Sequence, residues 1–447
     1  MRIAVIGSGV AGLSAAWALS ARHQVTLYEA DARLGGHAHT VEVDDAGRRT
    51  AVDTGFIVYN QAAYPNLTRL FAALEVPTEP SDMSFSVSLD GGAFEYQARA
   101  VGLLAQPGNI TSRRYRAMVR DIVRFCREAP ELLGSGSRES IGAYLRRQHY
   151  SEGFIRDFLL PELACIWSSR LDRMLDLPAE MLVRFFGNHG LLQLARRPRW
   201  RTVTGGSRVY VDAITATLAD VRVATPVTRV RRTSERVHVT AATGGEETFD
   251  HVVFATHADT TLAILGEGAS PAERSVLGAV RFQRNLAVLH MDPSLMPLRR
   301  RVWSSWNYLA DGHDDGHRDV SLTYWMNRLQ GLRTQRPVFV TLNPARPPRD
   351  AVGTFLYDHP QIDRAAADAQ AALPRLQGAS RTWFCGSWTS YGFHEDGSRS
   401  GLQVAAALGS PPPWPVEPMH AGEIDAGAMP AGEPPSIERT SVGSVVP

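Results

Sequence analysis

Runs of β-branched and aliphatic residues near the N-terminus flank an alanine-rich stretch. Residues 2–6 and 23–29 are strand-like, and between them the turn GSGVAG at 7–12 leads into the alanine-rich residues 13–21. Two apolar runs joined by a helical stretch predict a β-α-β unit, and units of this kind build parallel sheets. The chain is therefore expected to begin an α/β domain with a parallel sheet.

Three strand-like segments follow between residues 221 and 254. They read VRVATPVTRVRR, VHVTAAT and HVVFAT, with Gly244 and Gly245 at a turn. Closely spaced strands joined by a glycine turn predict an antiparallel meander, which here returns to a buried strand at Val252–Ala255. Residues 382–385 are predicted to be the last strand of the same domain, so its segments lie far apart in the sequence.

The segments between these strands show helical apolar spacing in one part and further strand-like runs in another. Helical apolar spacing covers residues 112–129, 141–148 and 154–160, whereas residues 272–348 contain the strand-like runs NLAVLHM, RVWSSWNYL, VSLTYWM and VFVTLN. We predict an inserted α+β domain that binds substrate. A disordered tail is also predicted, because nine of the 27 prolines follow residue 410. The predicted boundaries are 1–85, 200–265 and 375–409 for the parallel-sheet domain, 86–199 and 266–374 for the substrate domain, and 410–447 for the tail.

The charge balance and the residue usage exclude several classes of partner and enzyme. The 47 basic and 46 acidic residues nearly cancel, so the overall balance predicts no nucleic-acid partner. All basic residues are arginine, which excludes a Schiff-base or phosphate-binding lysine and with it a Walker-type ATPase. Cys126, Cys165 and Cys385 are far apart and lack zinc spacing, which fits a reducing compartment. No metal site is predicted.

Hydropathy along the chain bears on its location. No window reaches the ~18 uninterrupted apolar residues of a membrane span, and the opening apolar run contains three glycines, unlike a signal peptide. We therefore expect a cytoplasmic protein, with at most peripheral contact at the inner face of the membrane.

The pattern Gly7-x-Gly9-x-x-Gly12 follows a predicted strand and opens a predicted helix. In this setting the first glycine permits a tight turn, the second lets backbone N–H groups approach a pyrophosphate, and the third lets the helix pack on the strand. Glu29 ends the next strand, where a carboxylate accepts hydrogen bonds from a ribose 2′-hydroxyl. The alternative, a glycine-rich turn with a surface glutamate, is the weaker reading given this placement. The motif predicts a dinucleotide, either NAD or FAD.

Two further glycine sites distinguish between NAD and FAD as the predicted cofactor. Residues 29–37 read EADARLGGH and residues 53–56 read DTGF. Together with the GxGxxG turn they resemble the flavoprotein superfamily of amine oxidases, protoporphyrinogen oxidases and phytoene-type desaturases. The resemblance implies a Rossmann-like FAD-binding domain, with Glu29 on the adenosine ribose, residues 33–36 along the pyrophosphate and ribityl chain, and Gly55 and Phe56 near the flavin. His37 stands where many relatives have arginine.

Later landmarks match the same superfamily. Val227 corresponds to a valine whose backbone contacts adenine, and Ala255-Thr256 lies where the sheet meets the cofactor. Cys385-Gly386-Ser387 matches the end of the last strand, with serine in place of the usual aspartate. A helix from Asp396 through Leu408 is expected to point its N-terminal amides at the flavin and to stabilise the reduced ring. The cofactor-binding residues implied are Gly7, Ser8, Gly9, Ala11, Gly12, Glu29, Ala30, Arg33, Gly35, Gly36, His37, Asp53, Thr54, Gly55, Phe56, Val227, Ala255, Thr256, Gly386, Ser387, His394, Glu395 and Asp396.

His394 and Glu395 are the predicted catalytic residues, because they are titratable and lie at the flavin-facing end of that helix. Either one orients substrate or moves a proton. The alternative is that both only contribute backbone contacts and bond their neighbours, since hydride transfer to a flavin often needs only positioning and desolvation.

Aromatic residues on the predicted strands of the substrate domain favour an apolar substrate, although such sets are more often part of a core. Amine oxidases of this superfamily carry a lysine near the flavin, so its absence disfavours a typical amine oxidase. The aromatic residues are Trp303, Trp306, Tyr308, Tyr324 and Trp325.

A closer resemblance rests on the phrases DTGFIVYN, SWNYL, TYWMNRLQ and GFHEDGSRSG. They are similar to bacterial FAD-binding proteins associated with cyclopropane-fatty-acid-synthase-like methyltransferases, over residues 1 to about 409. This resemblance implies oxidation or desaturation of a lipid acyl chain, in a small molecule or a membrane lipid, by hydride transfer to FAD. Two alternatives stay open. One is a non-redox flavoprotein isomerase or sugar mutase with arginines clustered over the flavin, and the other is a flavin-bearing partner of a lipid methyltransferase.

Overall fold

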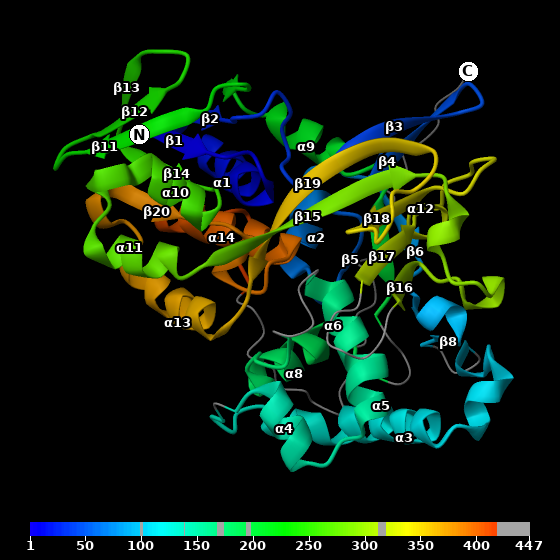
Figure 1. Ribbon diagram of the computed structural model, residues 1–447. Helices are drawn as coiled ribbons and strands as arrows, with labels where there is room; N and C mark the ends of the chain where they lie inside the picture. The colour runs from blue at the N-terminus through cyan, green and yellow to red at the C-terminus, as the bar shows by residue number, and fades with distance from the viewer. Residues whose placement is uncertain (99–101, 138, 168–173, 194–197, 312–318, 418–447) are drawn as a thin grey trace, which may run out of the picture.

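The computed structural model describes residues 1–98, 102–137, 139–167, 174–193, 198–311 and 319–417. A parallel sheet with a small meander lies on one side of the molecule and a large mixed sheet on the other, and a group of helices lies below both (Figure 1). None of the described helices has the length and hydropathy of a membrane span.

The parallel sheet has five strands in the order β10-β2-β1-β14-β20. Ile3 in the central strand pairs with Val25 on one side and with His251 on the other. A central strand covered on both faces requires a nearly continuous apolar sequence, which the first strand has. The predicted α/β fold with a parallel sheet is thereby confirmed. The strands are β1 (Arg2–Ile6), β2 (Gln24–Tyr28), β10 (Asp220–Arg222), β14 (His251–Phe254) and β20 (Thr382–Phe384).

Alternate residues of β1 serve two cores, one on each face of the sheet, because side chains alternate along a strand. Ile3 and Val5 pack with α1, α2, α9 and α14, whereas Ala4 and Ile6 pack toward the meander, α10, α11 and α13. The helices are α1 (Val10–Ser20), α2 (Pro65–Ala73), α9 (Arg208–Thr215), α10 (Ala258–Leu265), α11 (Pro271–Gly278), α13 (Arg364–Ala372) and α14 (His394–Ala407). The meander consists of β11 (Val227–Arg232), β12 (Val237–Ala241) and β13 (Glu246–Phe249).

The large mixed sheet has the order β19-β15-β18-β17-β16-β7-β8. Its two longest strands pair from Arg281–Gln361 through His290–Ala351 and run from the parallel-sheet side into the large sheet (Figure 1). The strands are β7 (Phe85–Leu89), β8 (Phe94–Gln97), β15 (Arg281–His290), β16 (Trp306–Asp311), β17 (Asp319–Trp325), β18 (Phe339–Leu342) and β19 (Ala351–Gln361), and α12 (Met326–Leu329) follows β17. Two small sheets contain β3 (Thr40–Asp45) with β4 (Arg48–Asp53), and β5 (Tyr59–Asn60), β9 (Trp200–Val203) and β6 (Thr78–Ser81).

The helical part has its own aromatic core, centred on the fully buried Phe154. Tyr391 and Phe393, from the loop before α14, pack into this core as well. The helical part therefore reaches the start of α14. Its helices are α3 (Arg113–Glu128), α4 (Ile141–Arg147), α5 (Glu152–Phe154), α6 (Leu160–Trp167) and α8 (Ala179–Asn188), with a π-turn at Ile155–Leu159.

Several boundaries differ from the sequence-based expectation. The strand β19 was not predicted, because its sequence AVGTFLYDHPQ contains a glycine and a proline. Residues 301–303 were expected in a strand, but Arg300–Val302 forms a 3₁₀ turn and the strand begins at Trp306. The helix α14 begins two residues before Asp396, because the Asp396 carboxylate accepts a hydrogen bond from the Phe393 amide and caps the helix there. The strand β10 joins the parallel sheet rather than the meander.

Residues 410–417 pack on the parallel-sheet domain, which corrects the expectation of a disordered tail from residue 410. The Ser410 hydroxyl is buried and donates to the Ala18 carbonyl at 2.6 Å, and the Trp414 ring stacks on Trp17 at 5.6 Å. Prolines prevent a helix here but leave side chains free to pack. Residues 418–447 of the expected tail lie outside the described residues. The predicted domain boundaries remain a prediction.

Candidate functional site

The glycine-rich turn joins β1 to α1. A Cβ atom on Gly12 would lie 1.9 Å from the carbonyl oxygen of Gly7, so only glycine lets the helix approach its own turn. Gly9 is the N-cap of α1 and supplies no side-chain cap, and a Cβ there would meet nothing within 4 Å. The space beside Gly9 is therefore open, and the uncapped N-terminus of a helix is suited to binding phosphate.

Glu29 lies beside this turn at the carboxyl end of β2. Its carboxylate accepts hydrogen bonds from the Ser8 amide at 2.9 Å, the Ser8 hydroxyl at 2.5 Å and the Asp31 amide at 2.9 Å. Ala30, next in the chain, is exposed. A carboxylate has about four acceptor positions, so Glu29 keeps room for a ribose hydroxyl.

The second glycine pair packs directly on the first. The Gly35 amide donates to the Ser8 carbonyl at 3.1 Å, and a Cβ on Gly36 would lie 3.1 Å from the Gly9 Cα. The Arg33 guanidinium donates to the carbonyls of Leu34 and Ala38 and so holds its own turn. The structure therefore brings Gly9, Gly36 and His37 together.

The Asp53 carboxylate is buried and bonded within the protein. Its side chain is 1 % exposed and accepts hydrogen bonds from the Thr40 hydroxyl, from the Ser207 amide and hydroxyl, and from the Gln330 side chain. Burial raises the pKa of Asp53 to about 6. Protein donors thus occupy this carboxylate, and the Asp53 amide in turn donates to Gln330 Oε1 at 2.9 Å. Contact between Asp53 and the cofactor remains a prediction.

The neighbours of Asp53 are closer to the turn of His37. The Thr54 hydroxyl lies 2.6 Å from the Tyr357 hydroxyl. A Cβ on Gly55 would lie 2.2 Å from the His37 carbonyl oxygen, which accepts a hydrogen bond from the Phe56 amide at 2.8 Å. Residues 54–56 therefore pack against the second glycine pair.

Residues 225–227 and 255–256, from the middle of the sequence, also lie at this edge of the sheet. Val227 is buried at the start of β11, and the nearby Thr225 amide donates to the Glu29 carbonyl at 2.8 Å. Ala255 lies under the turn, since a Cβ on Gly7 would be 2.9 Å from its carbonyl oxygen. The Thr256 hydroxyl bonds the Thr261 hydroxyl at 2.7 Å. Five separate segments, 7–12, 29–37, 53–56, 225–227 and 255–256, thus meet near the carboxyl ends of the parallel strands.

The C-terminal stretch also meets them there. The Gly386 amide donates to the Ser400 hydroxyl at 2.9 Å, and Ser387 follows in the turn that leads to α14. His394, the first residue of α14, stacks on Phe56 with ring centroids 3.7 Å apart, and its Nε2 lies 3.2 Å from the Tyr210 hydroxyl. Burial lowers the pKa of His394 to about 3, so this imidazole is neutral at neutral pH.

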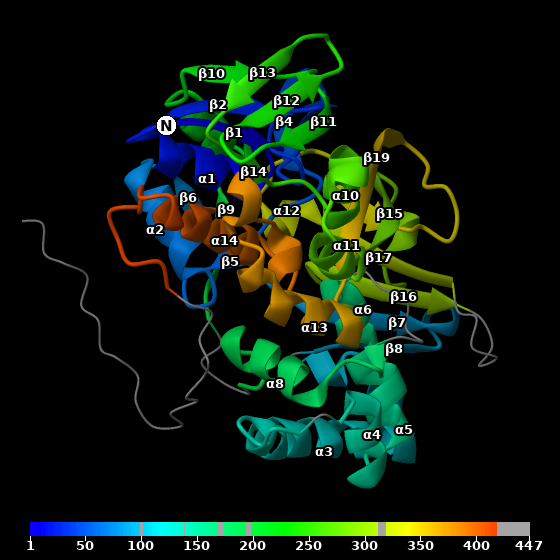
Figure 2. The same cartoon turned by 90° about the vertical axis from the view of Figure 1, so that its left-hand side faces the viewer.

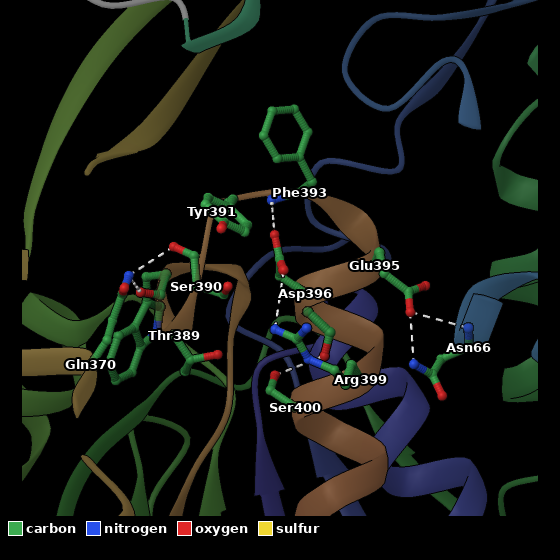
Figure 3. A network of polar contacts seen from close by, with 12 residues as sticks. Asn66, Gln370, Thr389, Ser390, Tyr391, Phe393, Glu395, Asp396, Arg399 and Ser400 are labelled. Atoms are coloured by element: carbon green, nitrogen blue, oxygen red, sulfur yellow. Dashed lines mark hydrogen bonds and ion pairs between the residues drawn. The ribbon is translucent and has the colours of Figure 1, made fainter. Parts of the chain in front are cut away.

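The two acids that follow His394 are bonded within the protein (Figure 3). Glu395 accepts hydrogen bonds from the Asn66 side chain at 2.7 Å and from the amides of Asn66 and Leu67, and so caps the first turn of α2. Asp396 accepts from the Phe393 amide and pairs with Arg399 at 3.1 Å, with both side chains buried. These contacts match the alternative that the acids bond their neighbours. A catalytic role for His394 or Glu395 remains a prediction.

The family model for flavin-containing amine oxidoreductases matches residues 10–286, more than half of the chain. The chain belongs to this family. It is an FAD-dependent oxidoreductase of the amine oxidase superfamily, as the sequence motifs predicted.

Solved structures with this fold extend the comparison. Cyclohexylamine oxidase from Brevibacterium oxydans IH-35A is 17 % identical, with a TM-score of 0.65, 91 % of this chain covered and 98 % of that chain. A proposed protoporphyrinogen oxidase from Exiguobacterium sp. 255-15 is 15 % identical, with a TM-score of 0.65 and the same coverage. A fatty acid isomerase from P. acnes, described as producing CLA, is 14 % identical, with a TM-score of 0.64 and again the same coverage. No curated protein matches this chain.

The residues present fit FAD at the carboxyl edge of the parallel sheet. The uncapped start of α1 suits the pyrophosphate, Glu29 suits a ribose, and the Nε2 atom of His37 is buried without a hydrogen-bond partner among the described residues. Within the described ranges, no cluster of His, Cys, Asp or Glu side chains has the arrangement of a metal site.

A small cavity of about 30 Å³ lies between the helical part and the start of α14. It is lined by Ala63, Tyr64, Pro65, Asn188, His189, Tyr391, Phe393, Glu395, Asp396 and Arg399. Sequence reasoning missed three side chains beside the predicted cofactor-binding residues, namely Tyr210, Tyr357 and His359. Tyr357 and His359 lie on β19, which was not predicted as a strand because its sequence contains a glycine and a proline. Tyr210 lies in an amphipathic helix that carries no motif.

Proposed function

We propose that this oxidoreductase oxidises or desaturates an apolar lipid acyl substrate. When bound, FAD supplies the acceptor for the hydride that leaves the substrate carbon. For a membrane lipid, the protein would act as a peripheral protein at the inner face of the membrane. The fold itself is compatible with several substrate classes, because the similar structures include proteins named for an amine and for a fatty acid.

The proposal rests on one observation: the charged side chains at the start of α14 already have hydrogen-bond or ion-pair partners within the protein. The three charged side chains that line the cavity are already engaged, Glu395 by α2 and Asp396 by Arg399. A charged substrate such as an amine would have to displace one of these buried contacts, at a cost of several kcal/mol for a broken buried pair. An apolar chain has no such requirement.

Aromatic side chains of α6 and α8 pack against Tyr391 and Phe393, in the loop before α14. The Phe185 ring lies 5.1 Å from Phe393 and 5.5 Å from Tyr391, and the Trp167 indole donates to the Tyr391 carbonyl at 3.1 Å. These rings pack against the loop that precedes α14, where Phe393 and His394 remain partly exposed. Trp303, Tyr308 and Tyr324, which were considered as pocket residues, are buried in the cores of the large sheet and so belong to the packing.

In this proposal His394 orients the substrate or its neighbouring groups. The imidazole is neutral, held flat against Phe56 and bonded to Tyr210, which suits positioning better than proton storage. Glu395 fixes the start of α14 to α2. The first amides of α14 are the expected stabilisers of negative charge on the reduced cofactor.

The proposal is tested by anaerobic bleaching of the flavin absorbance in the purified holoprotein. The panel contains phospholipid vesicles with saturated, monounsaturated or cyclopropane acyl chains, and cyclohexylamine and putrescine as amine comparators. We expect bleaching by at least one lipid and none by the amines. Bleaching by amines alone, or a retained flavin that no lipid reduces, would contradict the proposal. The second outcome would favour the flavin-bearing partner of a lipid methyltransferase, which co-purification would then test.

A further inference from the structure

Three imidazole rings from separate segments meet beside the glycine-rich turns. His37 follows Gly36, His257 precedes α10, and His359 lies on β19. The ring centroid of His37 lies 5.4 Å from that of His359 and 6.3 Å from that of His257. The cluster therefore joins the parallel-sheet domain to a strand of the large sheet.

His37 is held firmly but has a free nitrogen. Its backbone carbonyl accepts the Phe56 amide at 2.8 Å, and its ring lies 5.0 Å from that of Tyr357. The Nε2 atom is buried, and none of the described residues bonds to it. Buried polar atoms are rarely left unpaired, because the lost hydration costs about 1 to 3 kcal/mol. This nitrogen is therefore suited to a bound group.

The tautomer of His359 follows from a chain of hydrogen bonds that starts at the backbone. The Leu286 amide donates to Asn343 Oδ1 at 2.9 Å, so Nδ2 is the donor atom of Asn343, and it donates to Asn285 Oδ1 at 2.8 Å. Asn285 Nδ2 in turn donates to His359 Nδ1 at 2.9 Å. Because Nδ1 accepts, the proton of the neutral ring is on Nε2.

Both rings are neutral at neutral pH. Burial lowers the pKa of His359 to about 4, and burial together with the neighbouring His359 holds the pKa of His37 well below its usual range. Neutral imidazoles offer hydrogen bonds without adding charge. This pair differs in that respect from an arginine in the position of His37.

We propose that His37 and His359 form a neutral hydrogen-bonding pair for an oxygen atom of bound FAD, with Asn285 and Asn343 as positioning residues. The acceptor is a pyrophosphate oxygen or a carbonyl oxygen of the flavin ring, which share the same hydrogen-bond chemistry. His359 and Asn285 come from strands of the large sheet, so the cofactor site includes both parts of the molecule. No sequence motif marks either residue.

The test measures FAD binding and the midpoint potential of the flavin, neither of which requires turnover. His37→Asn and His359→Asn remove the proposed contacts, and His149→Asn at an exposed position is the matched control. We expect the dissociation constant for FAD to rise about 10-fold in each of the first two variants, as for one lost hydrogen bond. His359→Gln, whose longer side chain carries its amide donor to about the position of the His Nε2 atom, should recover part of the loss that the shorter Asn side chain causes. Asn285→Ala should weaken binding in the same direction, because it releases the His359 tautomer.

A second measurement identifies the acceptor oxygen. If it belongs to the pyrophosphate, His359→Asn weakens the binding of ADP to the apoprotein in parallel and leaves the midpoint potential unchanged. If it belongs to the ring, ADP binding is unchanged and the potential shifts. The proposal is overturned if His359→Asn, folded as judged by circular dichroism, changes neither FAD affinity nor potential, or if the control variant loses as much. Should His359→Asn not fold, unchanged FAD affinity in Asn285→Ala would overturn it.

Discussion

The Glu395 carboxyl group lies 7 % exposed between the start of α14 and the first turn of α2. Three hydrogen bonds from Asn66 and Leu67 favour its charged form, but burial outweighs them and raises its pKa to about 7 from 4.5. Between these values the folded protein holds a proton that the unfolded chain has lost. The contribution of this group to the free energy of unfolding therefore falls as the pH rises from 4.5 to 7.

Glu395→Gln is expected to remove this pH dependence. A shift of this size corresponds to about 3 kcal/mol between the two ends of the window. Chemical unfolding at pH 5 and pH 8 should show the wild-type protein losing stability relative to the variant as the pH rises. Glu235→Gln, at an exposed site, is the control and should follow the wild type. An equal pH dependence in wild type and Glu395→Gln would show that the carboxyl group titrates normally.

At the scale of elements, α1 and α14 determine how the two ends of the sequence meet. They lie side by side on one face of the parallel sheet (Figure 2), and the Ser14 hydroxyl donates to Ser398 at 3.0 Å. A Cβ on Gly401 would lie 2.2 Å from the Ala11 carbonyl oxygen. The close crossing of these helices, with both N-termini at the carboxyl edge of the parallel sheet, therefore depends on small residues in DGSRSG.

Gly401→Ala is expected to force the two helices apart. Overpacking of this kind costs about 1 to 3 kcal/mol, and it should also weaken FAD retention because α1 carries the pyrophosphate turn. Thermal unfolding and the FAD content after gel filtration measure the two effects. Gly108→Ala is the control, because a Cβ there would meet nothing within 4 Å. If Gly401→Ala matches the control in unfolding temperature and in FAD content, the packing of the two helices does not depend on this contact.

At the scale of the whole molecule, segments from the beginning, middle and end of the chain converge on one edge of the sheet. β1 pairs with β14, and β14 pairs with β20, so residues more than 240 positions apart become neighbours. Residues 410–417 then return to α1 and α2. A ligand bound at that edge should stabilise the segments that meet there together.

Purified protein is therefore expected to be yellow, with about one FAD per chain. Because FAD binds the folded state, added FAD should raise the unfolding temperature of apoprotein, with a gain of about 2.7 kcal/mol at a concentration 100 times the dissociation constant. Absorbance spectra and thermal melts across a range of FAD concentrations measure both. A colourless protein that takes up no FAD, with a melting temperature unaffected by it, would contradict the cofactor assignment for this chain.

The sequence alone determined the parallel sheet, the glycine-rich turns and the existence of the helix α14, because these depend on local spacing. The GxGxxG turn needs particular residues within six positions, and the strands around it need continuous apolar runs. The same reasoning predicts that Glu29 and the segment DGSRSG lie at the cofactor, and it left open whether His394 and Glu395 act chemically or bond their neighbours.

Only the tertiary structure decided what surrounds these residues. It assigned Glu395 to the cap of α2, surrounded the Asp53 carboxylate with protein donors, and brought His359 to His37. The contacts of Glu395 with Leu67, of Asp53 with Ser207 and of His359 with His37 each join residues more than 100 positions apart, and none follows from a spacing in the sequence. The tertiary structure therefore decides which of the side chains predicted at the site remain available for chemistry, because burial and hydrogen-bond partners, which set charge and tautomer, arise only when distant segments pack together.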